Sequence, residues 1–203
     1  MAVSPWKIIS SRYVVRDRWM TMRADCCLTV TGTVVDPYYV QEANDWVQVV
    51  AFDAHDRILI TRQYRHAAGI VSTELPCGTV EQGESPAEAI RRELQEETGC
   101  EFDELVSLPV LSPNPARFSN WIHPFIASGT RQVKQPLADE TEILEFEFLP
   151  VAAVLSLIDT GRFPQALHVA SLLFALRLRG VLTYATGADS GDTAAHPFQQ
   201  VQP

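Results

Sequence analysis

The chain of 203 residues has little of what several classes of protein require. It contains four cysteines and no Cys-x-x-Cys pair, and two of the four, Cys26 and Cys27, are adjacent. Adjacent residues on a strand face opposite sides, so we do not expect a disulfide framework. No apolar run approaches the ~18 residues of a membrane-spanning helix, and the first residues lack a basic and apolar leader. We therefore expect a soluble, cytoplasmic protein without a membrane partner.

Positive charge is also scarce. Lysine and arginine number 16 against 25 acidic residues, which gives a net charge of −9. Nucleic-acid binders neutralise phosphates with lysine and arginine, so a nucleic-acid partner is not expected. An acidic protein that handles a phosphate compound needs a cation between the two. A hydrophobic content of 46% is enough to bury the core of one domain with a small additional region.

Residues 78–100 are the most informative part of the sequence. Glu93, Glu96 and Glu97 are spaced by three and four residues, so they are neighbours on one face of a helix. Three like charges at this distance repel one another, and a hard divalent cation such as Mg²⁺ removes the repulsion. Taken alone, the three glutamates are equally compatible with a solvated acidic helix. Their arrangement nevertheless suggests a metal site.

The residues around these glutamates predict where the helix begins and ends. Ser85 and Glu88 have the spacing of a capping box, and Gly99 follows the last turn, where a left-handed residue ends a helix. Arg92 is four residues from both Glu88 and Glu96, so it can orient either carboxylate. The spacing therefore predicts a short, well-capped helix.

The complete pattern is Gly78, five residues, Glu84, seven residues, and then Arg92-Glu93-Leu94-x-Glu96-Glu97-x-Gly99 followed by Cys100. It resembles the Nudix box at every fixed position, with cysteine in place of the usual aliphatic residue at the end. The resemblance implies an α+β protein with a Nudix-type α/β/α sandwich and a mixed sheet. It also implies a diphosphohydrolase that uses Mg²⁺, for which Mn²⁺ may be exchanged. The residue roles it implies are metal ligation by Glu93, Glu96, Glu97 and the main-chain oxygen of Cys77, with Glu96, Glu97 and Arg92 acting in catalysis.

Two segments before the box extend the resemblance. Arg62-Gln63-Tyr64-Arg65 and Glu74-Leu75-Pro76-Cys77-Gly78 are similar to an arrangement in nucleoside-diphosphate-sugar hydrolases, above all ADP-ribose pyrophosphatases. Guanidinium groups suit phosphate oxygens, although a solvated strand edge is the alternative for the arginines. The expected substrate-binding residues are Arg62, Arg65 and Glu74, together with Arg117 from the loop 112–120 and Trp46, which is a candidate for an adenine or dimer contact.

An acidic segment, residues 137–142, precedes an expected strand. In the ADP-ribose branch, an acidic loop at this place supplies the base that activates water and sometimes another metal ligand. The resemblance assigns the base to Glu140 and the ligand to Glu142, and the two roles can be exchanged. An ordinary acidic turn is the alternative, because a carboxylate acts as a base only where it reaches the attacking water.

The chain divides into three regions. Residues 1–45 alternate β-formers and turn residues, which predicts an antiparallel meander too small to bury both faces. It looks like the β-region through which the ADP-ribose pyrophosphatase branch builds a homodimer. Residues 46–182 are expected to form the Nudix domain, and residues 183–203 a disordered tail. The expected domain strands are 46–52 and 58–64, joined as a hairpin, and 72–75, 104–111, 121–127 and 143–149, followed by helices 151–158 and 164–179.

The functional expectation is Mg²⁺-dependent hydrolysis of the diphosphate of a nucleoside diphosphate linked to a sugar. ADP-ribose, which would give AMP and ribose 5-phosphate, is the favoured small-molecule substrate. Alternatives are a Nudix hydrolase of a GDP-sugar, a dinucleotide or a damaged nucleotide, and a non-catalytic nucleotide-sugar sensor. The complete set of Glu93, Glu96 and Glu97 argues against the sensor. His123 and His168 lie in apolar segments and are expected to be core histidines.

Overall fold

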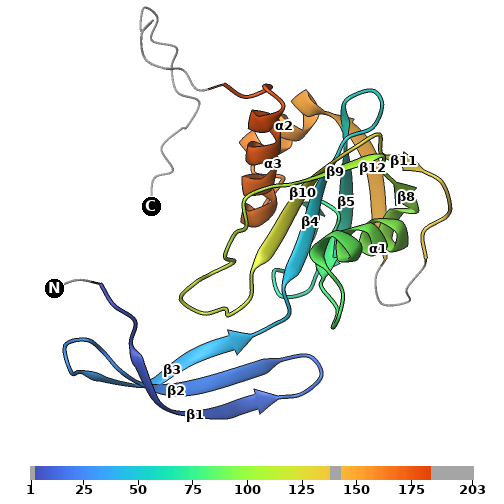
Figure 1. Ribbon diagram of the computed structural model, residues 1–203. Helices are drawn as coiled ribbons and strands as arrows, with labels where there is room; N and C mark the ends of the chain where they lie inside the picture. Colours follow the sequence, from blue (N-terminus) through green and yellow to red (C-terminus); the bar gives the residue numbers. More distant parts are fainter. Residues whose placement is uncertain (1–2, 138–142, 184–203) are drawn as a thin grey trace, which may run out of the picture.

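The computed structural model describes residues 3–137 and 143–183. Its body has three layers (Figure 1). Helix α1 (Pro86–Thr98) covers one side of the β-strands, and helices α2 (Val151–Asp159) and α3 (Ala166–Leu178) cover the other. The predicted α/β/α sandwich is confirmed. No helix of the described residues is long and apolar enough to cross a bilayer.

The middle layer is built from mixed strand pairings. One sheet has the order β7-β4-β10-β9, in which β4 and β10 run parallel and the other neighbours antiparallel. A second sheet has the order β12-β5-β6, and β11 pairs with β8. The strands of the body are β4 (Trp46–Ala51), β5 (Arg57–Arg65), β6 (Ile70–Glu74), β7 (Cys77–Thr79), β8 (Cys100–Glu101), β9 (Glu104–Ser107), β10 (Ile122–Ser128), β11 (Arg131–Gln132) and β12 (Leu144–Pro150).

Strand β4 is buried on both faces, which explains its nearly continuous apolar sequence. Val47 and Val49 belong to the core cluster that contains Ile90 and Leu94 of α1. Val50 belongs to the opposite cluster, which is formed with α2 and α3. Full burial of such a side chain stabilises the fold by roughly 1.5–3 kcal/mol. Strand β4 is thereby fixed between the layers, and its first residues position one side of the pocket described below.

The predicted hairpin of residues 46–52 and 58–64 is wrong. Beyond the single bridge between Phe52 and Ile58, β4 and β5 separate into different sheets. The turn itself is held by Asp53, whose Oδ1 accepts hydrogen bonds of 2.8 Å from the backbone N–H groups of His55 and Arg57. Apart from the bridge, β4 pairs with β7 and β10, and β5 pairs with β12 and β6. These pairings take the place of the expected hairpin. The expected strand 104–111 is also shorter, because β9 ends at Ser107.

The N-terminal meander consists of β1 (Lys7–Arg16), β2 (Thr21–Leu28) and β3 (Val34–Glu42), paired antiparallel in that order. It projects from the body as a separate layer (Figure 1). Strand β3 joins it to the loop before β10: Gln41 donates to the Arg117 oxygen at 2.7 Å and accepts from the Ser119 N–H at 3.1 Å. The predicted meander is therefore present, and a loop of the body holds it. The expected disordered tail lies, from residue 184 onward, outside the described residues.

Candidate active site

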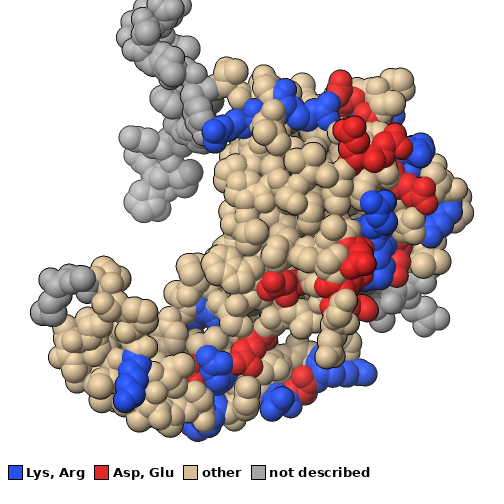
Figure 2. Space-filling model, in the orientation of Figure 1, with Lys and Arg blue, Asp and Glu red and all other residues tan. Residues whose placement is uncertain are grey.

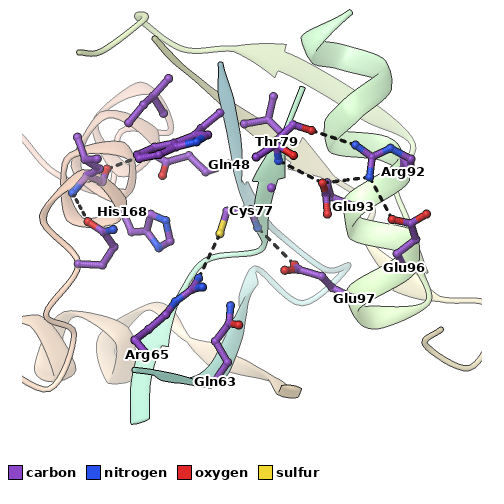
Figure 3. A pocket seen from close by; sticks show the side chains of 16 residues that line it. Gln48, Gln63, Arg65, Cys77, Thr79, Arg92, Glu93, Glu96, Glu97 and His168 are labelled. Carbon is purple, nitrogen blue, oxygen red and sulfur yellow. Dashed lines mark hydrogen bonds and ion pairs between the residues drawn. The ribbon is translucent and has the colours of Figure 1, made fainter. Parts of the chain in front are cut away.

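A pocket of about 480 Å³ opens between α1, the start of β4, strand β7 and the start of α3. Its volume lies within the range of roughly 300–1,000 Å³ that is usual for small-molecule sites. Figure 3 shows the glutamates of α1 on one wall and His168 on the opposite wall, with Cys77 between them. The sequence-predicted site residues that line it are Trp46, Arg65, Cys77, Arg92, Glu93, Glu96 and Glu97.

Helix α1 is capped as the sequence predicted. The capping box between Ser85 and Glu88 is complete, and Gly99 ends the helix with a φ of 67°. Because Glu88 accepts from the Ser85 backbone at 2.8 Å and from its hydroxyl at 2.6 Å, it is committed to the cap. Of the two carboxylates that Arg92 was expected to orient, Glu96 is the one that it contacts. The caps hold the acidic face of α1 in one orientation toward the pocket.

Arg92 binds the carboxylates on both sides of the box. Its Nε and Nη2 donate to Glu84 at 3.0 and 3.1 Å, and its Nη1 lies 3.1 Å from Glu96 and 3.0 Å from Glu93. Figure 2 shows acidic and basic side chains side by side over α1. These contacts raise the pKa of Arg92, chiefly through the hydrogen bonds to Glu84. Arg92 therefore orients the acidic wall.

Gly78 leaves the space that Glu93 occupies. A Cβ at position 78 would lie 1.9 Å from the Glu93 Cδ, so the Glu93 carboxylate could not stay where it is. Glu93 also accepts from the Thr79 N–H at 3.2 Å, and Glu97 accepts from the Cys77 N–H at 3.3 Å. Burial raises the pKa of Glu93 above its ordinary value, and Arg92 opposes this only in part. Strand β7 and α1 thus approach closely enough for the backbone of β7 to donate hydrogen bonds to Glu93 and Glu97.

The donor set of this wall fits a divalent cation. Glu93, Glu96 and Glu97 supply hard carboxylate oxygens, the ligands that Mg²⁺ prefers. Glycine at position 78 leaves no side chain between Glu93 and the backbone of β7. Negative charge that is buried and crowded, as the raised pKa of Glu93 reports, is the condition that a cation relieves.

The opposite wall carries an ion pair in which Glu74 is buried and Arg65 is partly exposed. Arg65 donates from Nε and Nη2 to the two oxygens of Glu74 at 2.9 and 2.6 Å. Glu74 is only 3% exposed, and burial works against its ionisation. The hydrogen bonds from Arg65 outweigh this effect, so the pKa of Glu74 lies below its ordinary value. The pair keeps a guanidinium at the pocket while cancelling most of its charge.

Several predicted residues are not brought to the pocket. Arg62 forms an ion pair with Glu147 of β12, on the face of β5 opposite to Arg65. Arg117 is exposed in the loop that binds β3. Glu140 and Glu142 lie outside the described residues. The substrate and catalytic roles of these four residues stay predictions.

Other lining residues escaped the sequence analysis. Gln48 and Gln63 both line the pocket. Gln48 interrupts the otherwise apolar strand β4, and that interruption was an available signal, whereas Gln63 lies in a strand with several other polar residues. His168 is 4% exposed, as expected for a core histidine, yet it also lines the pocket. Burial lowers the pKa of His168 to about 4, so its ring is neutral near pH 7. His123 is partly exposed and its Nε2 lies 2.9 Å from Asp45, so the core assignment was wrong for this residue.

Comparison with protein families agrees with this geometry. A family model described as "NUDIX domain" matches residues 43–170, which is more than half of the chain. The chain belongs to the Nudix family. A second model, "Nucleoside diphosphate sugar hydrolase N-terminal domain", matches residues 6–41, the segment that forms most of the meander. The predictions of a Nudix fold and of a Nudix hydrolase are confirmed.

Named relatives share this Nudix domain. The chain is 27% identical over 175 residues to an ADP-ribose pyrophosphatase of Mycobacterium tuberculosis, covering 85% of this chain and 84% of the relative. It is 34% identical over 124 residues to the ADP compounds hydrolase NudE of Escherichia coli, covering 60% of this chain and 64% of the relative. A crystal structure of an ADP compounds hydrolase superimposes with a TM-score of 0.79 at 24% identity, covering 90% of this chain and 100% of that one. This last likeness bears on the fold alone.

Proposed function

We propose that this Nudix hydrolase cleaves the diphosphate of a nucleoside diphosphate linked to a sugar, with ADP-ribose as substrate and AMP and ribose 5-phosphate as products. The observation that carries the proposal is the pocket of about 480 Å³ between the carboxylates of α1 and the Arg65 wall. The pocket is large enough for a nucleotide-sized ligand. The names of the relatives and of the N-terminal family model support the substrate class.

The acidic wall would hold Mg²⁺, for which Mn²⁺ can substitute. Glu93, Glu96 and Glu97 supply carboxylate oxygens, and Cys77 its main-chain oxygen. Bound Mg²⁺ would neutralise the diphosphate and make its phosphorus atoms better targets for water. The chain's own contribution is positional: Arg92 orients the carboxylates, and Gly78 lets Glu93 approach β7.

A base completes the proposal. Glu140 would take the proton of the attacking water, and Glu142 would add a metal ligand, or the two would exchange roles. Both residues lie in the segment before β12, close in sequence to Leu137, whose N–H donates to the main-chain oxygen of Glu96 at 2.9 Å. That hydrogen bond fixes Leu137 to α1, and Glu140 and Glu142 themselves lie outside the described residues.

The remaining predicted substrate contacts differ in their support. Arg65 lines the pocket, where a guanidinium can bind a phosphate oxygen. Glu74 would hold Arg65 in place rather than touch the substrate. Trp46 also lines the pocket and packs edge-on against Phe118 with ring centroids 5.9 Å apart, which suits a contact to a base. Arg62 and Arg117 do not line this pocket, so they would contact the substrate only from outside it or in an assembly with another copy of the chain.

We further propose that the protein is a homodimer formed through residues 1–45. All ten residues of β1 are exposed. They include a run of large apolar side chains that monomeric proteins rarely leave in water. The exposed large apolar residues in β1 and directly before it are Trp6, Ile8, Ile9, Tyr13, Val14 and Val15.

One substrate panel tests the function. The purified protein is incubated with ADP-ribose, GDP-mannose, a dinucleotide and deoxynucleoside triphosphates, and nucleoside monophosphate release is measured with Mg²⁺. We expect the highest catalytic efficiency with ADP-ribose, complete loss with a chelator, and recovery with Mg²⁺ or Mn²⁺. A clear preference for the triphosphates would refute the proposed substrate class. Tight binding of ADP-ribose without turnover would instead support the sensor.

A further inference from the structure

His168 is held in one tautomer by the backbone. The N–H of Leu75 donates to its Nδ1 at 3.0 Å inside the fold. An N–H donor needs a lone pair on Nδ1, so the neutral ring must carry its proton on Nε2. Among the described residues, Nε2 has no hydrogen-bonding partner of its own. His168 therefore presents a fixed N–H donor from a wall of the pocket.

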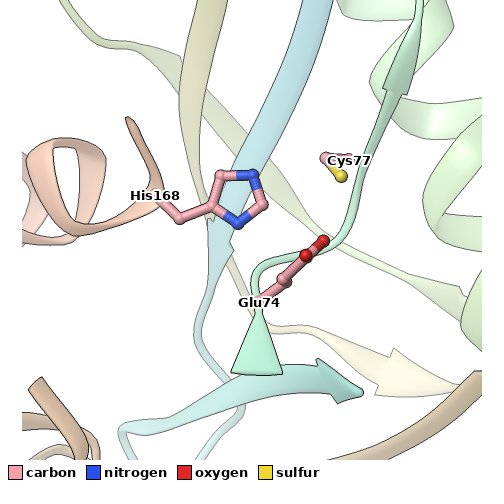
Figure 4. A group of neighbouring side chains, drawn as sticks. All are labelled: Glu74, Cys77 and His168. Atoms are coloured by element: carbon pink, nitrogen blue, oxygen red, sulfur yellow. The ribbon is translucent and has the colours of Figure 1, made fainter. Parts of the chain in front are cut away.

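The group around His168 is not built for a metal. Ligand atoms of Glu74, Cys77 and His168 lie within 4.8 Å of one another, which would suit a cation such as Zn²⁺ by proximity alone (Figure 4). A metal-binding histidine, however, offers a lone pair to the metal and donates from its other nitrogen. His168 has the reverse arrangement, and both oxygens of Glu74 already bind Arg65. The three side chains therefore leave a donor facing the pocket instead of a third ligand.

The position of this donor relates it to the proposed reaction. His168 faces the acidic wall across the pocket, and the chain between them is Cys77, whose N–H binds Glu97 (Figure 3). Arg65 lies on the same side, with its Nη2 4.0 Å from the Cys77 sulfur. A diphosphate bound at the acidic wall would have oxygens that point away from α1, toward these two donors.

We propose that His168 donates a hydrogen bond from Nε2 to a non-bridging phosphate oxygen of the substrate, on the side remote from the α1 carboxylates. The inference rests on the proposed diphosphatase function and adds a substrate-binding residue to it. A phosphate oxygen is purely an acceptor, which matches a nitrogen that is locked as a donor. A neutral donor also binds an anion without competing with the cation for the glutamates.

The helix that carries His168 is fixed, so the donor is pre-organised. Gln48 of β4 donates to the Leu167 oxygen at 3.0 Å and also bonds to Ser171. Gln165 caps the first turn by accepting from the Leu167 N–H at 3.1 Å. These contacts hold the first turn of α3 against the strand that begins at Trp46. A donor held in this way loses little conformational freedom when substrate binds.

Two substitutions separate the substrate role from a structural one. In His168→Asn, the amide oxygen can still accept from Leu75, but no donor reaches the Nε2 position. In His168→Gln, the amide nitrogen reaches the Nε2 position, while the bond to Leu75 is weakened. We expect His168→Asn to lower kcat/KM for ADP-ribose by roughly 10- to 100-fold, the effect of one hydrogen bond to a charged group. His168→Gln should retain most of the activity despite a lower Tm.

The opposite ranking, a fully active Asn variant beside an inactive Gln variant, would show a purely structural role and overturn the proposal. If the Asn variant fails to fold, ¹⁵N NMR of the wild-type histidines decides. Addition of Mg²⁺ with a non-hydrolysable methylene analogue of ADP-ribose should shift the protonated Nε2 of His168, and Mg²⁺ alone should not. The proposal is overturned if the bound analogue leaves the Nε2 signal of His168 unchanged. It is also overturned if added Zn²⁺ removes the Nε2 proton. Wild-type protein that hydrolyses no panel substrate refutes the function, whereas the NMR experiment still tests the donor.

Discussion

The two regions of this molecule are both rich in β-strands, yet they bury their side chains differently. In the body, β4 and β5 are almost entirely buried, because helices cover both faces of the strands. In the meander, β1 is exposed along its whole length and β2 alone contributes fully buried residues. The apolar side chains of β1 are therefore left exposed to solvent in a single copy of the chain.

This difference divides the work between the regions. The body contains the pocket and holds its carboxylates through caps, glycine and arginine, all within a single copy. The meander contributes none of the pocket-lining residues that the structure describes. The proposed role of the meander is contact with a second chain, and changes to each region test this division.

The largest expected effect lies in the body. Glu97→Gln keeps the shape of the side chain but removes the charge that would hold a cation, so turnover should fall by several orders of magnitude at saturating Mg²⁺. Glu93→Gln should behave alike. Glu104→Gln, an exposed position on β9, is the matched control and should leave turnover unchanged. Steady-state rates and thermal unfolding are the measurements. Wild-type turnover in Glu97→Gln would remove the basis for the metal site.

Glu140→Gln should lower the maximal rate by roughly 10²–10⁴-fold, the usual contribution of a general base. Substrate binding should stay nearly unchanged, because the residue would contact water and not the sugar. Glu142→Gln should instead raise the Mg²⁺ concentration required for half-maximal rate. Titrations of each variant against Mg²⁺ and substrate distinguish the two. If Glu140→Gln keeps at least about a third of the wild-type rate, where a base would contribute far more, the base is another residue.

Gly78→Ala tests the close approach within the body. Because the added Cβ would lie 1.9 Å from the Glu93 Cδ, the carboxylate must move aside. A displacement of about 1 Å in a catalytic group can reduce the rate by roughly 10²-fold. Gly161→Ala adds the same methyl group where nothing lies within 4 Å, but its φ of +68° strains an alanine, so it gives an upper limit for the effect of the substitution away from the site. Equal activity of the two variants would contradict the proposed role of Gly78.

Removal of the meander tests directly whether this region forms the proposed dimer interface. Light scattering of the full chain at micromolar concentration should give the mass of a dimer. A chain that starts at Asn44 should be monomeric or poorly soluble and less active, because it lacks the proposed interface. A chain that ends at residue 183 is the control and should remain dimeric. A monomeric wild type, or a soluble and active chain from Asn44, would refute the dimer.

The smallest expected effect concerns acid stability. Asp25, 2% exposed in β2, accepts from Arg23 at 2.8 and 3.1 Å, and these hydrogen bonds hold the pKa of Asp25 below its ordinary value. A lowered native pKa means that its stabilisation is complete above the unfolded pKa of about 3.9 and is lost as the pH falls through the native pKa. Asp25→Asn should therefore reduce stability by about 1–3 kcal/mol at pH 7, and by less below pH 4.

Asp53→Asn is the counterpart in the body, where the Arg57 Nε donates to the Asp53 carboxylate at 2.7 Å. Burial raises the pKa of Asp53, but the hydrogen bonds from Arg57 outweigh it, so the pKa is also lowered. Denaturant unfolding at several pH values compares the variants. If the regions unfold separately, Asp25→Asn should change only the transition of the meander. An equal effect of both variants on a single transition would instead show one cooperative unit.

The sequence predicted α1 almost completely because its signals are local. Ser85, Glu88 and Gly99 specify the ends, and spacing alone puts the glutamates on one face. Strand pairing was predicted less well, because β4 and β5 each pair with two other strands and belong to different sheets.

Arg62, Arg65 and His168 show a second limit of prediction from sequence, which concerns the orientation of side chains. Alternation predicts that Arg62 and Arg65 face opposite sides of β5, but not which side meets the pocket. That choice depends on Glu74 of β6 and Glu147 of β12, which lie far apart in the sequence. The orientation of His168 depends likewise on the backbone of Leu75, 93 residues earlier, and no local pattern reports it.

The loop before β10 touches both regions: it binds β3 through Gln41 and places Phe118 against Trp46 at the pocket. A small molecule wedged between Phe118 and Trp46 would disturb the pocket wall while leaving the space for the nucleotide empty. Because Trp46 is proposed to contact the base, such an inhibitor would weaken substrate binding. The seam between meander and body is therefore a target for selective inhibition that does not require mimicry of a charged diphosphate.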